Sequence, residues 1–381
     1  MKKKVIIGLS GGVDSSVAAL ILQKHNYEVE GIFMRNWDSS LNYDIQGNPY
    51  INNNICPQAQ DFQDALKIAQ QLNIKCHKVD FSHEYWTQVF TSFLKFLSKN
   101  LTPNPDVLCN NHIKFLTFIK YAEQFQPDYI AMGHYAKVTL KNKRNILTKA
   151  LDVSKDQTYF LSQLQHKQLN KIIFPLGNLT KNQVRKIAVQ ESLVTAHKKD
   201  STGICFIGER KFSSFLQNYL PIKKGVIKNI NNDEVLKQHQ GVIYYTIGQR
   251  KGLNLGDINN NSLPWFVVGK NLKTNTLYVD QNHNSPYLYS DSALVINVVW
   301  RSYKNFNNCG RMKLKAKFRY RQPDQDVEID WINKKVLKVY YPKTIKSVTP
   351  GQVCAFYYNE FCLGAGMIKE VYYQNQKRLY T

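Results

Sequence analysis

The segment Ser10-Gly11-Gly12-Val13-Asp14-Ser15-Ser16 has the residue types of a phosphate-binding loop. It follows the apolar run 5–9 and precedes an apolar segment of helical length, so it should join a strand to a helix. Glycines allow backbone amides to close on phosphate oxygens, serines add hydroxyl donors, and a helix N-terminus adds a positive dipole. A Walker loop would need Gly-Lys-Ser/Thr after a longer gap, which is absent here. The alternative is an ordinary tight turn with an Asp/Ser cap.

A second segment, 102–111, places an acidic residue three positions before a cysteine. Pro103 and Pro105 stiffen a loop ahead of the helix-like stretch 114–122, and Asp106 and Cys109 can face the same side. A thiolate is favoured near a helix N-terminus. The pattern predicts a reactive Cys109, although a proline-rich helix start with a buried cysteine fits it equally well.

A third segment, 197–210, surrounds Cys205 with basic residues and glycines. The cluster His197-Lys198-Lys199 would favour a thiolate, and glycines suit a loop that approaches another group closely. A buried structural cysteine is the alternative. Two cysteines on separate loops of a nucleotide-binding domain suggest sulfur transfer, in which one thiol carries a persulfide and the other resolves it.

The first loop resembles the pyrophosphate loop of the ATP pyrophosphatases, which activate a carbonyl-type oxygen as an adenylate. That resemblance implies that Asp14 helps to hold magnesium. The three segments, together with three further runs, resemble the bacterial tRNA-specific 2-thiouridylases over effectively the whole chain. The further runs are Gly133-His134-Tyr135-Ala136, Lys155-Asp156-Gln157-Thr158-Tyr159-Phe160-Leu161 and Tyr245-Thr246-Ile247-Gly248-Gln249-Arg250-Lys251-Gly252.

The resemblance implies a role for individual residues. The triphosphate of ATP would lie on Gly8, Leu9, Ser10, Gly11, Gly12, Val13, Asp14 and Ser15. Met34 and Gly133 would contact the adenosine part. The target base would meet Asn104, Pro105 and Asp106, with Asp106 as the acid/base. Cys109 would be the nucleophile and Cys205 the persulfide carrier. The tRNA would be touched by His134, Lys155, Asp156, Gln157, Arg319, Tyr320 and Gln352.

The implied reaction is an ATP-dependent exchange of oxygen for sulfur. ATP would adenylate the C2 oxygen of the wobble uridine, with AMP as the leaving group and Mg²⁺ neutralising the phosphates. Sulfur would arrive on Cys205 from a sulfur-relay protein or a cysteine desulfurase, and Cys109 would release it by forming a disulfide with Cys205.

Other pyrophosphate-loop enzymes are the nearest alternatives. Argininosuccinate, GMP and NAD synthetases and tRNA lysidine synthetases need no cysteine pair. A tRNA cytidine thiolase would be expected to show Cys-x-x-Cys cluster ligands, which the chain lacks. A nucleotide-sensing RNA-binding protein without turnover is the alternative from outside the enzymes.

A parallel sheet must hold these segments. Up to about residue 210, strands expected at 5–9, 29–34, 75–80 and 129–134 alternate with helices at 16–23 and 61–72. This alternation predicts an α/β fold with helices on both faces and ligands at the carboxyl edge.

Shorter β-like runs follow at the spacing of a small barrel or sandwich: 241–245, 265–269, 294–300, 313–320, 335–341, 352–357 and 364–372. We therefore predict an ATP-binding catalytic domain at 1–210, a central tRNA-binding domain at 211–286 and a C-terminal β-barrel at 287–381.

The charge balance favours a polyanionic partner. Lys and Arg number 51 against 28 Asp and Glu, a net charge of +23, which attracts RNA. An AT-biased genome would inflate the Lys, Asn, Ile and Tyr content without any partner. The run 313–321 alternates basic and apolar residues, so a strand there would show one cationic face. A solvated edge strand fits it as well.

The cysteines and the N-terminus indicate a cytoplasmic protein without a membrane partner. The number of cysteines, seven, is odd, and the apolar run 5–9 is far shorter than a signal-peptide core or a membrane span. No Cys-x-x-Cys pair offers a local zinc or iron–sulfur ligand set. Cys354 and Cys362 lie in an apolar β-like stretch and are expected in the core.

Overall fold

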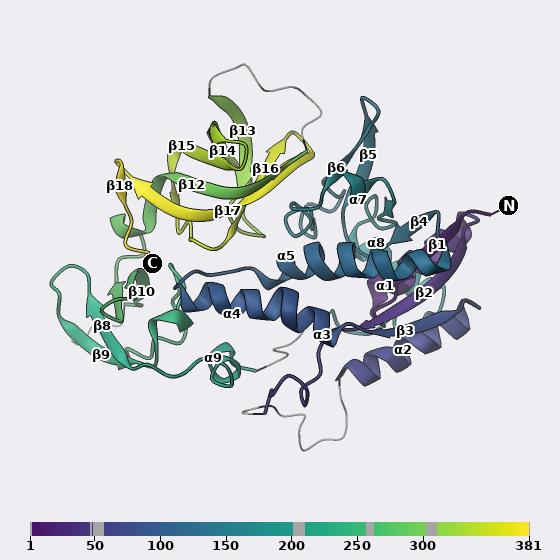
Figure 1. Ribbon diagram of the computed structural model, residues 1–381, viewed down its shortest axis with the longest axis horizontal. Coiled ribbons are helices and arrows are strands. Elements are labelled where there is room, and N and C mark those ends of the chain that lie inside the picture. Colours follow the sequence, from purple (N-terminus) through teal and green to yellow (C-terminus); the bar gives the residue numbers. More distant parts are fainter. Residues whose placement is uncertain are drawn as a thin grey trace.

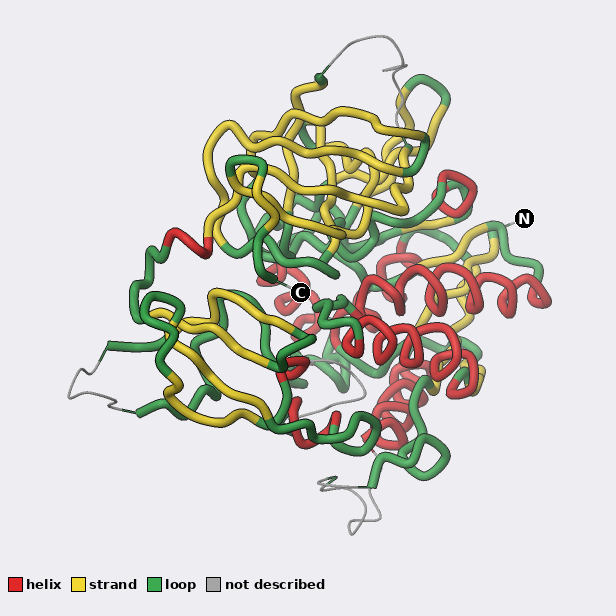
Figure 2. The backbone as a smooth tube through the Cα atoms, turned by 60° about the vertical axis from the view of Figure 1, so that its left-hand side comes forward, coloured by secondary structure: helices red, strands yellow, loops and turns green. Residues whose placement is uncertain are grey.

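The computed structural model describes residues 2–45, 48, 57–200, 210–256, 263–301 and 311–380. Figure 1 shows three parts: a sheet flanked by helices, a small β region, and a strongly curved sheet that contains the C-terminal strands. Figure 2, turned by 60°, shows the strands of the last part wrapped around a common interior. No helix in the described ranges is both long enough and apolar enough to cross a bilayer.

The first part is built on a five-stranded parallel sheet in the order β3-β2-β1-β4-β7. Its strands are β1 (Lys4–Gly8), β2 (Glu28–Arg35), β3 (Cys76–Asp80), β4 (Tyr129–Ala131) and β7 (Ile172–Ile173). β1 lies in the middle and is apolar throughout its buried residues, as expected of a strand covered on both faces. The predicted α/β fold is confirmed.

The helices of this part are α1 (Val13–Lys24), α2 (Pro57–Gln71), α3 (Ser82–Tyr85), α4 (Thr91–Ser98), α5 (Pro105–Cys109), α6 (Phe118–Ala122), α7 (His166–Leu169) and α8 (Lys181–Gln190). Turns of other pitch continue three of them: the π-helices η1 (Trp86–Phe90) and η2 (Asn110–Thr117) and the 3₁₀ turn η3 (Glu123–Phe125). The helix expected at 114–122 is thus part of a longer rod that begins at Pro105. Its start is set by the Asn104 side chain, which accepts from the Asp106 and Val107 amides.

The central part follows α9 (Phe212–Leu216) and contains a four-stranded sheet in the order β10-β11-β8-β9. Its elements are β8 (Gly225–Asn229), β9 (Val235–His239), η4 (Val242–Tyr244), β10 (Phe266–Asn271) and β11 (Thr276–Asp280). The strand expected at 241–245 is wrong, because this stretch forms the 3₁₀ turn η4, closed by the Tyr244 amide on the Gly241 carbonyl. A short continuous apolar run has no period, so its sequence pattern does not distinguish a buried turn from a strand.

After η6 (Pro286–Leu288) the chain forms a closed barrel. It consists of β12 (Tyr289–Trp300), β13 (Met312–Lys317), β14 (Gln325–Asn333), β15 (Val336–Lys346), β16 (Val353–Tyr358) and β17 (Phe361–Tyr373), followed by β18 (Gln376–Lys377). The barrel closes because β12 pairs with both β15 and β17. The predicted barrel is confirmed, and Cys354 and Cys362 are buried in it as expected.

The strand around 313 differs from the expectation at its end. Lys313 and Lys315 point outward and Leu314 and Ala316 inward, but the strand stops at Lys317 and a turn follows. Lys317 is buried, and its ammonium lies 3.7 Å from Asp156 and 3.8 Å from Asp324. The lysines at the start of this run thus face outward, whereas the Lys317 side chain is buried and lies near Asp156 of the first part.

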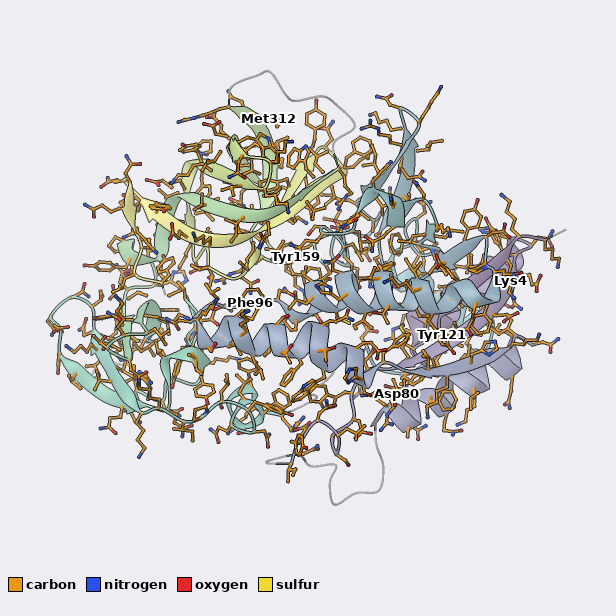
Figure 3. All side chains as sticks on the ribbon, in the orientation of Figure 1. Lys4, Asp80, Phe96, Tyr121, Tyr159 and Met312 are labelled. Atoms are coloured by element: carbon orange, nitrogen blue, oxygen red, sulfur yellow. The ribbon has the colours of Figure 1, made fainter. Side chains whose placement is uncertain are left out.

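A hairpin joins the barrel to the first part. It consists of β5 (Lys137–Lys141) and β6 (Arg144–Thr148), and Thr148 of β6 pairs with Phe361 of β17. Arg301 adds a buried link, since its guanidinium donates to the Ser162 carbonyl at 2.8 Å and also to the Leu164 carbonyl. Figure 3 shows Tyr159, from this linking region, between the barrel and the long helices.

Candidate active site

The loop between β1 and α1 has the geometry of a phosphate cradle. Gly11 has a left-handed φ of 72°, and a Cβ there would lie 2.1 Å from the Asp61 carbonyl oxygen, so only glycine fits. The N-cap residue of α1 is Gly12, which has no side chain to cap the first amides. The Ser10 and Ser15 hydroxyls lie 3.1 Å apart, and the Ser15 hydroxyl donates to the Gly12 carbonyl. The uncapped amides of the first turn can therefore receive an anion.

Asp14, in the first turn of α1, is held by partners that are distant in the sequence. The Lys181 ammonium lies 2.7 Å from one Asp14 carboxylate oxygen and 2.8 Å from the other. The Tyr135 hydroxyl donates to the same carboxylate at 2.8 Å. A carboxylate placed beside the loop and next to a lysine can take part in binding a metal–phosphate group.

Asp200 completes a network of opposite charges around Lys181. Its carboxylate lies 2.8 Å from the Lys181 ammonium, 2.6 Å from the Arg185 guanidinium and 3.3 Å from the Lys155 ammonium. Burial would raise the pKa of Asp200, but the hydrogen bonds and charges of Lys181 and Lys155 outweigh it and lower this pKa to about 2. Three cations thus converge on Asp200, and one of them, Lys181, also pairs with Asp14.

Lys181 and Arg185 were missed by sequence reasoning. They share one face of α8 because they are four residues apart. The start of this helix is fixed by a capping box that Thr180 and Gln183 form. Nothing in the local pattern indicates that this face meets Asp14, which is 167 positions away.

The residues expected to contact adenosine lie at the same edge of the sheet. A Cβ on Gly8, the last residue of β1, would lie 2.6 Å from the Met132 sulfur and 3.3 Å from the Met34 methyl carbon. Gly133 follows β4, and a Cβ there would lie 2.9 Å from the Ser15 amide nitrogen. The structure therefore brings Gly8, Met34 and Gly133 together beside the loop, and Met132 joins them. Leu9 and Val13 are core residues, so they can offer only their backbone.

Asp106 and Cys109 lie in the single turn of α5, directly before the π-helix η2. Pro105 is the first residue of this turn and Cys109 is buried. Burial raises the pKa of Asp106, and the nearby positive charge of Lys114 offsets part of that rise. The Asp106 carboxyl is half-buried, its pKa is raised, and it lies at a helix start that continues as a π-helix. These are properties of an acid/base residue.

His134 connects this turn to the loop. It follows Gly133, is buried, and packs against Phe115 and Phe174 with ring centroids 5.6 Å and 6.0 Å away. Burial, with the charge of Lys114, lowers the pKa of His134 well below its usual value, so the ring is neutral. Lys114 therefore acts on both His134 and Asp106. The end of β4 thus touches the loop through Gly133 and the rod that begins at α5 through His134.

The expected tRNA residues 155–157 line the side of this site. Lys155 is partly exposed and paired with Asp200. Gln157 exchanges hydrogen bonds with the Tyr135 backbone, at 2.9 Å in both directions. Asp156 is buried, and it accepts from the Ala150 amide and the Thr158 hydroxyl.

The expected tRNA residues of the barrel are half-buried at a junction of the three parts. Tyr320 packs against Phe160 with ring centroids 4.2 Å apart. Gln352 donates to the Thr102 carbonyl at 2.8 Å. Arg319 donates to the Ile247 and Ser347 carbonyls and to the Thr349 hydroxyl, at 3.1, 2.8 and 3.0 Å. Through these contacts the three residues help to hold the parts of the protein together. Their contact with tRNA stays a prediction.

Arg319→Ala should lower the free energy of unfolding by about 2–3 kcal/mol, because it leaves the Ile247 and Ser347 carbonyls without their charged donor. Chemical denaturation measures this. If Arg319 also neutralises a phosphate, the slope of log affinity for tRNA against log salt should fall by about 1. Lys313→Ala, on the outer face of β13, is the control for the loss of one positive charge. An unchanged slope in Arg319→Ala would remove it from the tRNA contacts.

Cys205 lies outside the described residues, as do Cys56 and Cys309. The described residues on either side of 201–209 are both anchored. Asp200 is held by the cations described above, and Arg210 pairs with the buried Asp44 through two hydrogen bonds at 2.5 and 2.7 Å. Asp44 also accepts from the Trp37 indole at 3.2 Å.

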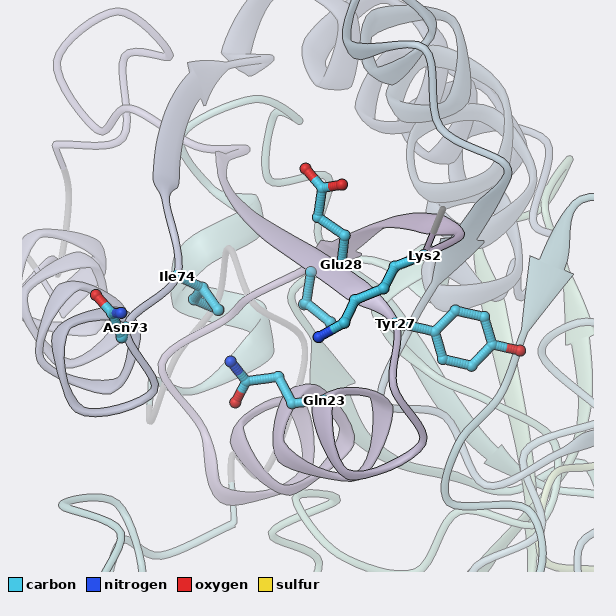
Figure 4. A pocket seen from close by; sticks show the side chains of 7 residues that line it. Lys2, Gln23, Tyr27, Glu28, Asn73 and Ile74 are labelled. Atoms are coloured by element: carbon cyan, nitrogen blue, oxygen red, sulfur yellow. The ribbon is translucent and has the colours of Figure 1, made fainter.

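An open pocket at the other edge of the sheet has a different character. Its lining residues precede strands β1, β2 and β3 or begin β2, rather than follow the strands (Figure 4): Lys2, Gln23, Tyr27, Glu28, Val29, Asn73 and Ile74. No residue of the candidate site lines it. Ligands of parallel sheets bind at the carboxyl edge, so this pocket does not alter the assignment.

Residues 3–209 match a family model described as a tRNA methyl transferase HUP domain, residues 213–281 a tRNA methyl transferase PRC-barrel domain, and residues 290–368 an aminomethyltransferase beta-barrel domain. The chain is 60% identical to the tRNA-specific 2-thiouridylase MnmA of Aster yellows witches'-broom phytoplasma (strain AYWB). This match covers 99% of this chain and 100% of the relative. It is 57% identical to the protein of the same name from Acholeplasma laidlawii (strain PG-8A), over 100% of both chains. On this evidence the chain belongs to the family of tRNA-specific 2-thiouridylases.

Proposed function

We propose that this protein transfers sulfur to a uridine of tRNA in an ATP-dependent reaction. The observation that carries the proposal is that two neighbouring residues after β4 face both halves of the candidate site. Gly133 lies against the glycine loop at the start of α1, and His134 packs on Phe115 of the rod that begins with the Asp106–Cys109 turn. A phosphate cradle and an acid/base carboxyl with a cysteine one turn away are the two devices that such an exchange needs.

ATP binds on the loop in this proposal. The uncapped amides of α1 receive the phosphates, while Lys181, Arg185 and Lys155 supply positive charge. Mg²⁺ binds through one or two carboxylates plus substrate phosphates, so Asp14 would hold it together with the triphosphate. Bound ATP supplies the leaving group that makes the uridine C2 carbon an electrophile.

The residues of α5 act on the base. Asn104 and Pro105 place Asp106 in the first helical turn, where its carboxyl can exchange a proton with the uridine. Cys109 is the nucleophile that attacks the persulfide of Cys205, forms a disulfide with it and so releases the sulfur. A sulfur-relay protein or a cysteine desulfurase supplies the persulfide. We assign the ATP-binding catalytic role to residues 1–210, tRNA binding to 211–286, and the supporting barrel to 287–381.

The proposed function is tested by mass spectrometry of tRNA nucleosides. The full chain is incubated with tRNA, ATP, Mg²⁺ and a persulfide donor, and each component is omitted in turn. We expect 2-thiouridine only in the complete mixture. Binding of tRNA and ATP without any thiolated nucleoside would instead favour a nucleotide-sensing RNA-binding protein.

Asp106→Asn should lower the thiolation rate by about 10²–10⁴-fold, the usual range for loss of a general acid/base. The fold should persist, because the amide has the same shape and Asn104 caps the helix through the backbone amide of residue 106. The rate is measured in single turnover at saturating tRNA and ATP. Asp326→Asn, an exposed carboxylate of the barrel, is the control. A rate within about 3-fold of wild type would exclude Asp106 as the acid/base.

A further inference from the structure

The central part contains a lysine that is buried without a counter-ion. Lys270 on β10 is 1% exposed, and within the described ranges no carboxylate pairs with it. Its ammonium nitrogen donates to the Asn100 carbonyl at 2.9 Å and to the Tyr245 carbonyl at 3.1 Å. Burial lowers the pKa of Lys270 to about 7. An uncharged amine has two N–H donors, which matches these two carbonyl acceptors. Burying such a group is costly, so its retention calls for a role.

The two carbonyls belong to different parts of the protein. Asn100 follows Lys99, the C-cap residue of α4, in a left-handed conformation with φ of 63°, and its amide donates to the Leu97 carbonyl. Tyr245 begins the run Tyr245–Gly252, which no step of the proposed reaction uses. The backbone amide of Lys270 donates to the Leu379 carbonyl at 2.8 Å. Lys270 therefore joins the catalytic part, the central part and the C-terminal segment.

Asn100 begins the short segment that leads into α5. In Figure 1 the chain leaves α4 beside the central part and returns along the molecule to α5. The Thr102 amide donates to the Pro350 carbonyl at 2.9 Å, and Gln352 donates to the Thr102 carbonyl. Asn104 then caps α5. The segment 100–104 is thus held by bonds from the central part and from the barrel, and it sets the position of Asp106 and Cys109.

We propose that Lys270 is a positioning residue for the sulfur transfer: it ties the Asn100 carbonyl to the Tyr245 carbonyl and thereby fixes the segment 100–104 that places Asp106 and Cys109. The proposal rests on the proposed function of α5. A displacement of about 1 Å in a reacting group can cost about 10²-fold in rate, so two hydrogen bonds remote from the base can control the chemistry.

The test replaces Lys270 in the full chain by Met, which keeps the length and loses both donors, and by Gln, which keeps an amide donor. Lys346→Met is the control, because Lys346 of β15 also donates to a carbonyl, that of His283, but at the surface and outside the part assigned to tRNA binding. Single-turnover thiolation at saturating tRNA should fall about 10²-fold in Lys270→Met, with a smaller loss in Lys270→Gln. KM for ATP should stay within about 2-fold, because the loop at α1 is not part of this segment.

Hydrogen exchange gives a second readout. Amides of residues 100–109 should exchange faster in both Lys270 variants, while those of α1 should not change. If Lys270→Met does not fold, the Gln variant carries both measurements. A lower unfolding midpoint with an unchanged rate per folded molecule would overturn the proposal and leave Lys270 with a structural role. If wild type and Lys346→Met form no 2-thiouridine, the proposed function fails instead.

Discussion

Cys109→Ser should abolish formation of 2-thiouridine, by more than about 10⁴-fold, while the protein still accepts labelled persulfide sulfur. A serine hydroxyl cannot attack the persulfide of Cys205 to form a disulfide, so sulfur stays on the protein. Cys205→Ser should bind tRNA and ATP but accept no label. Digestion of the labelled protein and mass analysis of its peptides locate the persulfide.

The structure provides controls for this experiment. Burial raises the pKa of Cys76 to about 11 and raises the pKa of Cys354 and Cys362 as well, so these thiols are protonated at neutral pH and poor nucleophiles. Cys76→Ser, at the start of β3, should therefore retain full activity. Label on Cys56 or Cys309, with both Cys109 and Cys205 variants still forming thiouridine, would overturn this division of roles and leave the loop assignment intact.

Asp14→Ala should reduce tRNA-dependent release of pyrophosphate by at least about 10²–10³-fold, because it removes the carboxylate proposed to hold the metal–phosphate group. The fold should survive, since Lys181 keeps its pair with Asp200 at 2.8 Å. Ser10→Ala should also impair the reaction, because Ser10 is exposed on the loop and contacts Ser15. Pyrophosphate release and ATP binding are both measured.

Asp128→Asn is the matched control for Asp14. Asp128 lies at the opposite edge of the same sheet, where it accepts from the Lys4 amide at 2.7 Å. This change removes a carboxylate without touching the loop. Undiminished pyrophosphate release by both Asp14→Ala and Ser10→Ala would refute the assignment of the loop.

Local patterns determined the strands, the helices and the glycine loop. The run Val5–Leu9 followed by two glycines and Asp14 predicts a strand, a turn and a helix start, and β1 and α1 confirm it. Such features depend on side-chain periodicity and backbone freedom within about ten residues, which a sequence displays directly. The same periodicity failed at Val242–Tyr244, where a buried 3₁₀ turn has the apolar content of a strand.

Only the tertiary structure decided which charges meet. The pairing of Asp14 with Lys181 spans 167 positions, and that of Lys270 with the Asn100 carbonyl spans 170. Arg319 lies in a basic run that suits an exposed strand, yet it bonds carbonyls at the junction with the central part. The sequence by itself determined that these residues are charged and which local elements carry them. Their partners depend on how the three parts pack, because burial and opposing charges, rather than local spacing, set the energy of a charged side chain.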